Sequence, residues 1–246
     1  MISGAEYVGG IVGYVNHSYS NRYIERCHVD ANIYGGSCTG GICGALEPSA
    51  YTSHIKECSY KGTISGESRI GGILGGSSSS IGEDTFYILG CKADVTINVS
   101  EDIAGGIYGY ALGKIRVLGC YVTGTLNCEK SNARDLGGIS GATDSSSDYQ
   151  AELCYSTMVS SHSNFGGLSG HDSTLRGIYA KDCASVVSSK GYEFVNCNTS
   201  CTDITDFLRS CYSSYAEYYN FDSTWTWTGK VNGAKTNVSC PKLSWE

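Results

Sequence analysis

The most regular feature of the chain is an alternation of apolar and polar positions that returns about every 31 residues. In the first copy, cysteine, valine, alanine and isoleucine occupy alternate positions across residues 27–33, with polar residues between them. This period of two predicts a half-buried β-strand. Each copy begins at an in-register cysteine, at Cys27, Cys58, Cys91, Cys120, Cys154 and Cys183.

A glycine phrase separates successive strand copies. An apolar or small residue is followed by Gly-Gly, then by Ile or Leu, any residue, and Gly. The glycine pairs are Gly9 and Gly10, Gly40 and Gly41, Gly71 and Gly72, Gly105 and Gly106, Gly137 and Gly138, and Gly166 and Gly167. Because an internal period of this size is typical of a solenoid or a stacked array, each repeat is interpreted as one coil.

These patterns predict an all-β fold, a parallel β-helix of about six coils of about 31 residues, with a right-handed coil preferred. Equivalent side chains should stack in files, because successive coils lie roughly 4.8 Å apart. Cysteine suits an interior file, since a free thiol packs as a small apolar group. We expect each glycine pair to form a corner that requires positive φ or close backbone approach.

The domain organisation follows from where the repeats stop. Residues 1–187 are predicted to form the β-helix, and residues 188–246 a C-terminal capping segment rich in aromatic residues and cysteine. The aromatic residues allow two interpretations, a cap over the last coil or a platform for glycans or a partner. The N-terminal end has no comparable segment, so we expect the first coil to meet further repeats, another domain or a neighbouring subunit.

Composition and charge exclude some classes of function. The 246 residues carry a formal net charge of −7, which gives no electrostatic footprint for nucleic acid. No apolar stretch approaches the roughly 20 residues that cross a bilayer. We therefore expect no nucleic-acid partner and no membrane span.

The remaining cysteines fall outside the repeat register. Cys197, Cys201, Cys211 and Cys240 are candidates for two disulfides, with a four-cysteine metal site as the weaker alternative. Cys38 and Cys43 could form a bridge across a turn, or Cys43 could fill a core position.

Motifs with a chemical mechanism are not found in the sequence. The histidines lack the His-Glu-x-x-His spacing of zinc peptidases, and no serine lies in a Gly-x-Ser-x-Gly elbow. His162 and His171 flank the last glycine phrase and are interpreted as surface residues. We predict no catalytic residue, no metal and no cofactor. Four Asn-x-Ser/Thr sequences are candidate glycosylation sites, at Asn16, Asn98, Asn198 and Asn237.

The two phrases together resemble the GLUG-motif repeat, in which an Ile-x-x-Cys-Tyr-x-x-Gly-x-Ile strand accompanies Gly-Gly-Ile/Leu-Val-Gly. Residues 117–126 match this strand closely, and residues 104–109 supply the glycine phrase. The resemblance covers about three quarters of the chain as repeats, and the tail through Trp245 is similar to the ends of such arrays. It implies a large secreted or surface-anchored protein of adhesin type. The peptidase activity associated with some relatives belongs to their other domains.

The predicted function is a non-enzymatic extracellular or cell-surface β-helix that acts as a structural or adhesion module. It could be a stalk or filament subunit that assembles head to tail through its N-terminal coil. The alternative is a carbohydrate-binding or carbohydrate-active β-helix that uses one face of the rod, with a glycan or a cell-surface ligand as partner.

Overall fold

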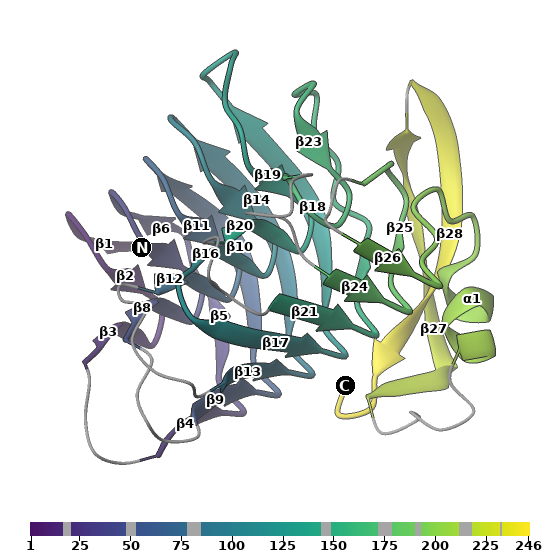
Figure 1. Cartoon of the computed structure of the whole chain (residues 1–246), viewed down its shortest axis with the longest axis horizontal. Coiled ribbons are helices and arrows are strands. Elements are labelled where there is room, and N and C mark those ends of the chain that lie inside the picture. Colours follow the sequence, from purple (N-terminus) through teal and green to yellow (C-terminus); the bar gives the residue numbers. More distant parts are fainter. Residues whose placement is uncertain are drawn as a thin grey trace.

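The computed structural model describes residues 1–16, 21–47, 53–77, 85–143, 149–171, 179–189, 193–211, 218–231 and 233–246. Within these ranges the chain is nearly all β, with one helix, α1 (Ile204–Cys211). Parallel sheets stack as a solenoid of about five turns, which confirms the predicted parallel β-helix (Figure 1).

Four parallel sheets form the sides of the solenoid in the described residues. Sheet A contains β1 (Ile2–Ser3), β5 (His28–Asp30), β6 (Ile33–Tyr34), β10 (Ser59–Gly66), β14 (Lys92–Val99), β18 (Tyr121–Cys128), β22 (Tyr155–Ser156) and β25 (Ala184–Ser185). Sheet B contains β2 (Val8–Gly9), β7 (Thr39–Gly40), β11 (Ile70–Gly71), β15 (Ala104–Gly105), β19 (Leu136–Gly137) and β23 (Phe165–Gly166).

The other two sides follow sheet B along the chain. Sheet C contains β3 (Val12–Val15), β8 (Cys43–Leu46), β12 (Leu74–Ser77), β16 (Tyr108–Ala111) and β20 (Ser140–Thr143). Sheet D contains β4 (Arg22–Glu25), β9 (Ser53–Lys56), β13 (Thr85–Leu89), β17 (Lys114–Leu118), β21 (Tyr149–Glu152), β24 (Tyr179–Lys181) and β26 (Glu193–Val195). Each coil therefore passes through sheets D, A, B and C in turn. Strand β26 extends the sheet D stack beyond residue 187, where the sequence pattern ends.

The core is built from files of equivalent residues in register. Ile33 pairs with Ile64, and Ile64 with Ile97, so three isoleucines stack inside sheet A. The residue after each glycine pair forms a second file, and beyond the first coil it is fully buried, at Ile42, Ile73, Ile107, Ile139 and Leu168. Burial of each such side chain stabilises the fold by about 2 kcal/mol.

The glycine pairs are required for close backbone approach and not for positive φ. A Cβ on Gly72 would overlap the carbonyl oxygen of Gly106 in the next coil, and a Cβ on Gly71 would overlap Leu74 O. Positive φ falls one residue earlier than the phrase, at Tyr7, Cys38, Arg69, Ile103 and Asp135. One half of the prediction for the glycine pairs is therefore confirmed, whereas non-glycine residues supply the left-handed corners.

A second series of left-handed residues turns sheet D into sheet A. The residue before each in-register cysteine, and the residue before Cys197, has φ between 50° and 62°, at Arg26, Glu57, Gly90, Gly119, Leu153, Asp182 and Asn196. Non-glycine residues rarely adopt this conformation. Hydrogen bonds to the next coil hold it in place, as from Arg26 N to Lys56 O at 3.0 Å and from Glu57 N to Leu89 O at 2.9 Å.

The C-terminal segment packs against the outward side of sheet A. It comprises α1 and an antiparallel hairpin of β27 (Tyr219–Val231) and β28 (Ala234–Leu243), and α1 also contacts β25 (Figure 1). Tyr155 OH donates to Pro241 O at 2.7 Å, and Tyr219 OH donates to Leu153 O at 2.6 Å. The tail thus lies along several coils at their side, and its role as a cap of the last coil stays a prediction.

We expect Gly72→Val to destabilise the solenoid by about 3 kcal/mol or more, because the new side chain overlaps the neighbouring coil's backbone. Denaturant unfolding followed by circular dichroism measures this. The control is Thr125→Val, on the exposed outward face of sheet A, which should change stability by less than about 0.5 kcal/mol. Equal effects of the two substitutions would contradict the role assigned to the glycine.

Tyr219→Phe should weaken the attachment of the hairpin, because Leu153 O loses a buried hydrogen bond. The expected cost is about 1 to 2 kcal/mol in the same unfolding assay, with faster proteolysis of the tail. Tyr34→Phe is the matched control, since that ring is 44% exposed and should tolerate the change. An unaltered Tyr219→Phe variant would show that the hydrogen bond does not anchor the tail.

Candidate functional site: the cysteine ladder and the open first coil

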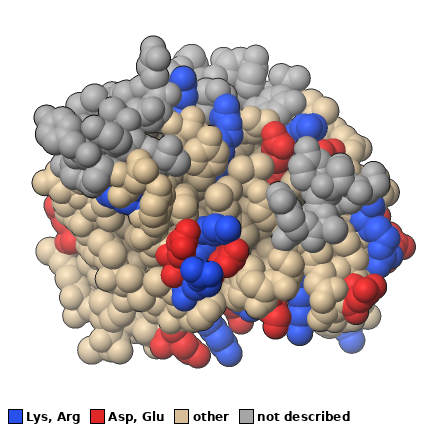
Figure 2. All heavy atoms as spheres, turned by 90° about the horizontal axis from the view of Figure 1, so that it is seen from below, with Lys and Arg blue, Asp and Glu red and all other residues tan. Residues whose placement is uncertain are grey.

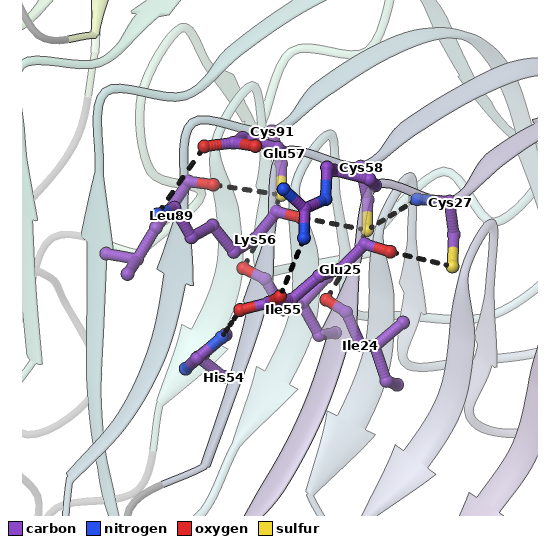
Figure 3. Close-up of polar contacts among 11 residues, drawn as sticks. Ile24, Glu25, Cys27, His54, Ile55, Lys56, Glu57, Cys58, Leu89 and Cys91 are labelled. Atoms are coloured by element: carbon purple, nitrogen blue, oxygen red, sulfur yellow. Dashed lines mark hydrogen bonds and ion pairs between the residues drawn. The ribbon is translucent and has the colours of Figure 1, made fainter.

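The in-register cysteines stack as a ladder at the corner between sheets D and A. Cys58 Sγ lies 3.3 Å from Lys56 O and 3.5 Å from Ile24 O of the preceding coil, and it accepts the amide of Cys27 at 3.5 Å (Figure 3). The two carbonyl contacts recur at Cys91, Cys120, Cys154 and Cys183, and Cys120 also accepts the amide of Cys91 at 3.3 Å. Each thiol therefore contacts carbonyls of its own and of the preceding coil and connects the two.

Cys197 occupies a seventh place in this ladder. It accepts the amide of Cys183 at 3.4 Å and lies 3.3 Å from Ala180 O. Its prediction as a disulfide cysteine is therefore wrong: it follows Cys183 by only 14 residues, far from the repeat period, and yet it keeps the ladder position. The signal that could have found it is Phe194, since an apolar residue three positions before the cysteine also precedes the ladder cysteines at Ile24 and in later coils.

The predicted disulfides are not present in the structure, where all thirteen cysteines are free thiols. Cys201 and Cys240 instead pack in a second apolar cluster under the hairpin. Cys211 Sγ accepts a hydrogen bond from Asn196 Nδ2 at 3.2 Å. Cys38 is also unbridged and lies at a left-handed corner.

The remaining early cysteine fills the core. Cys43 pairs with Val12 on one side and with Leu74 on the other. It is fully buried, as one of the two interpretations of its position predicted. Its neighbours are apolar, so the side chain is a packing residue of sheet C.

Burial makes these thiols poor nucleophiles. Burial raises the pKa of Cys43 to about 12 and that of Cys201 to about 11. It also raises the pKa of the ladder thiols Cys120 and Cys154. Because the thiolate is the reactive form, the ladder acts through packing and hydrogen bonds.

A small charged network lies on the outer side of the same corner. Glu25 Oε1 is 2.6 Å from His54 Nε2, and the hydrogen bond from His54 is the main cause of a lowered pKa of that carboxyl group. The His54 ring stacks on Tyr23, with centroids 4.5 Å apart. Acidic and basic side chains also lie mixed near the middle of the face in Figure 2. This pairing indicates a solvated, charge-balanced surface.

The two histidines that flank the last glycine phrase, and the serines within the last two glycine phrases, Ser140 and Ser169, lie in structural positions. His162 Nε2 is 3.1 Å from Lys130 O, and His171 forms an ion pair with Asp135. Ser140 and Ser169 are fully buried within the stack, where a substrate could not reach them. His17 lies outside the described residues.

The four candidate glycosylation sites have different environments. Asn16 and Asn237 are exposed, whereas Asn98 and Asn198 are half-buried. Asn98 belongs to a side-chain ladder on sheet A, in which Asn127 Nδ2 donates to its Oδ1 at 2.9 Å. A glycan on Asn98 would break this ladder. Modification at the four sites stays a prediction.

The first coil, residues 1–30, leaves the end of the core uncovered in the described structure. Ile11 is 48% exposed, whereas its equivalent Ile42 is fully buried. Strands β2, β3 and β4 each lie at an edge of their sheet, so one row of backbone groups in each is unpaired by neighbouring strands. An apolar file and free strand edges thus end at the same surface.

Two further features concern the described residues taken together. Within the described ranges, no group of three or more His, Cys, Asp or Glu side chains is arranged to hold a metal ion. In the same ranges, no helix is long and apolar enough to span a membrane.

No protein-family model, curated protein or solved structure matches this chain. The likeness to the GLUG-motif repeat therefore stays a prediction that rests on the strand phrase and the glycine phrase.

Thiol labelling tests the ladder directly. Without reductant, the unfolded chain should present thirteen reactive thiols to a disulfide reagent. The native chain should present at most the four partly exposed ones, since nine are buried. Fewer than thirteen thiols in the unfolded chain would indicate disulfides.

The buried thiols should also make the stability depend on pH. Because an unfolded thiol ionises near pH 8.5 and a buried one only at higher pH, the free energy of unfolding should fall above about pH 8.5.

Proposed function

We propose that this chain is a non-enzymatic β-solenoid module that serves as a stiff structural or adhesive unit, located outside the cell or on its surface. Every coil is connected to its neighbours by in-register pairing, so load along the axis is shared by the four sheets. The resemblance to surface repeat proteins supports the location. The titratable groups at the sheet D corner are paired with one another, which suits a structural surface.

The single observation that carries the proposal is the open first coil. Its apolar residues occupy positions that are buried in later coils, and its edge strands offer unpaired N–H and C=O groups. Such an edge is a template for pairing with another strand. We infer that this first coil joins to a further coil, whether of the same protein or of a second copy.

The two ends of the solenoid are not alike, which bears on how copies associate. At the C-terminal end, α1 contacts β25, and Gly167 and Leu168 bond to the segment that contains Ser188 and Ser189. A head-to-tail filament would have to accommodate this covering. Association of two first coils about a two-fold axis uses the open surface on both partners. We therefore favour a closed pair over a filament.

Light scattering after gel filtration measures the assembly. The wild-type chain should approach twice its mass of 26.1 kDa as concentration rises, and Ile11→Lys should remain monomeric, because a charge then lies within the interface. Val195→Lys is the matched control at the other end, where Val195 is 37% exposed. It should dimerise like the wild type.

Each other result has a defined meaning. If the wild-type chain is a monomer at all concentrations, the proposed association through the first coil is wrong. A growing series of larger species that Val195→Lys abolishes would replace the closed pair with a head-to-tail filament. Circular dichroism of both variants checks that the solenoid is intact.

A further inference from the structure

A shallow polar trough runs along the outward side of sheet A, from the first coil toward the hairpin. Its floor has two rows of side chains that cross the strands in register. His28, Ser59 and Lys92 form one row, and Asp30, Lys61 and Asp94 form the other. Both rows reach β18, where the next residues are Tyr121 and Thr123. The trough thus follows the axis of the solenoid over four strands.

Two connected hollows define the trough. The first, of about 410 Å³, lies between the two rows over β5, β10 and β14. The second, of about 200 Å³, is bounded by Tyr121, Thr123, Trp225 and Lys242. Lys92 and Asp94 line both hollows, so a ligand could extend from one into the other.

The second row presents charges that the protein does not pair. Within the described residues, no hydrogen bond or ion pair engages the side chains of Asp30, Lys61 or Asp94, although they alternate in sign on neighbouring strands. By contrast, Lys92 is held by Glu246. An acceptor, a donor and an acceptor therefore face solvent in sequence, at the roughly 4.8 Å spacing of strands.

Trp225 from the tail bounds the second hollow of the trough, and Trp245 lies beside its first row. Trp225 Nε1 donates to Tyr155 OH at 3.3 Å, which fixes the indole beside Tyr121, with ring centroids 6.4 Å apart. At the other end, Trp245 Nε1 donates to Gly90 O at 2.8 Å, and its ring lies 5.4 Å from that of His28. Both indoles are oriented by a hydrogen bond to a neighbouring residue.

We propose that this trough binds an extended oligosaccharide of neutral hexoses. Sugar hydroxyls both donate and accept hydrogen bonds, so they match a row that alternates carboxylate and ammonium groups. Aromatic rings have the apolar faces on which the C–H side of a sugar ring packs. One hexose is about as long as one strand spacing, so each coil would contact one sugar. Four strands span roughly 14 Å, the length of three to four hexoses.

The geometry favours a glycan over a peptide. Strands β10 and β14 are paired on both sides, so a peptide could not bind there by adding a strand. The proposal is independent of the association through the first coil, because the trough lies on a side of the solenoid.

Calorimetric titration with cello- and malto-oligosaccharides of two to six residues tests the proposal on the intact chain. At least one series should bind with a dissociation constant of about 1 mM or tighter. The affinity should rise up to the tetrasaccharide and then level off, because the trough ends at β18. Tryptophan fluorescence should change on binding, since Trp225 lines the trough.

Two variants locate the site. Asp94→Asn keeps the shape of the floor but removes the carboxylate that lines both hollows. Trp225→Phe replaces the indole that bounds the second hollow with a smaller ring. Each should weaken binding by at least about tenfold, on the scale of a lost charged hydrogen bond. The matched control is Glu129→Gln, an exposed acid on the same chain outside the trough, which should bind within about twofold of the wild type.

Three results would overturn the assignment. These are no binding of either series at millimolar concentration, binding that neither trough variant weakens, and an affinity that is the same for the disaccharide and the hexasaccharide. Binding confined to peptides, tested with a random peptide array, would replace the glycan with a protein partner.

Discussion

The structure depends on how closely the backbones of neighbouring coils approach at the glycine phrase. In each repeat the glycines face carbonyl oxygens of their own or an adjacent coil at a distance that excludes a Cβ. Only there can the chain turn from sheet B into sheet C while every coil keeps the same outline. The in-register files follow from that constancy, since equivalent residues then fall directly above one another. The isoleucine file and the cysteine ladder are both consequences of this spacing.

The corner between sheets D and A also turns the chain while the coils keep the same outline, but it does so without a glycine pair. A residue with positive φ bends the chain, and the following cysteine lies where its thiol reaches two carbonyls and accepts the amide of the cysteine in the preceding coil. The thiol is small enough for the corner and polar enough to satisfy it. Serine could bond similarly but would bury a more polar group, and alanine would lose the thiol's contacts, although Lys56 O would keep the amide of Arg26 as a donor. This explains why cysteine recurs at a position that carries no reactivity.

Much of the fold could be predicted from the sequence, because the same residue pattern recurs in each coil. Period two, the cysteine register and the glycine phrase together indicated a parallel β-helix, which the structure has. The left-handed corners could not be predicted, because Tyr7, Cys38 and Arg69 share no residue type. Cys197 was misplaced because the last turn is short. The lateral packing of the tail had a signal that went unused, since outward positions that are polar in early coils become Tyr121 and Tyr155 later. The trough needs residues from coils and tail together, and only tertiary structure unites them.

The lateral attachment of the tail has a consequence for how such a protein can vary in length. Contacts at Gly90, Tyr121 and Tyr155 tie the hairpin to particular coils. Duplication or loss of a coil between them would move these anchors apart by a whole strand spacing. Coils on the far side of the first one meet no such constraint. Lineages that carry this architecture should therefore gain and lose repeats at the N-terminal end, while the coils beside the tail remain constant in number.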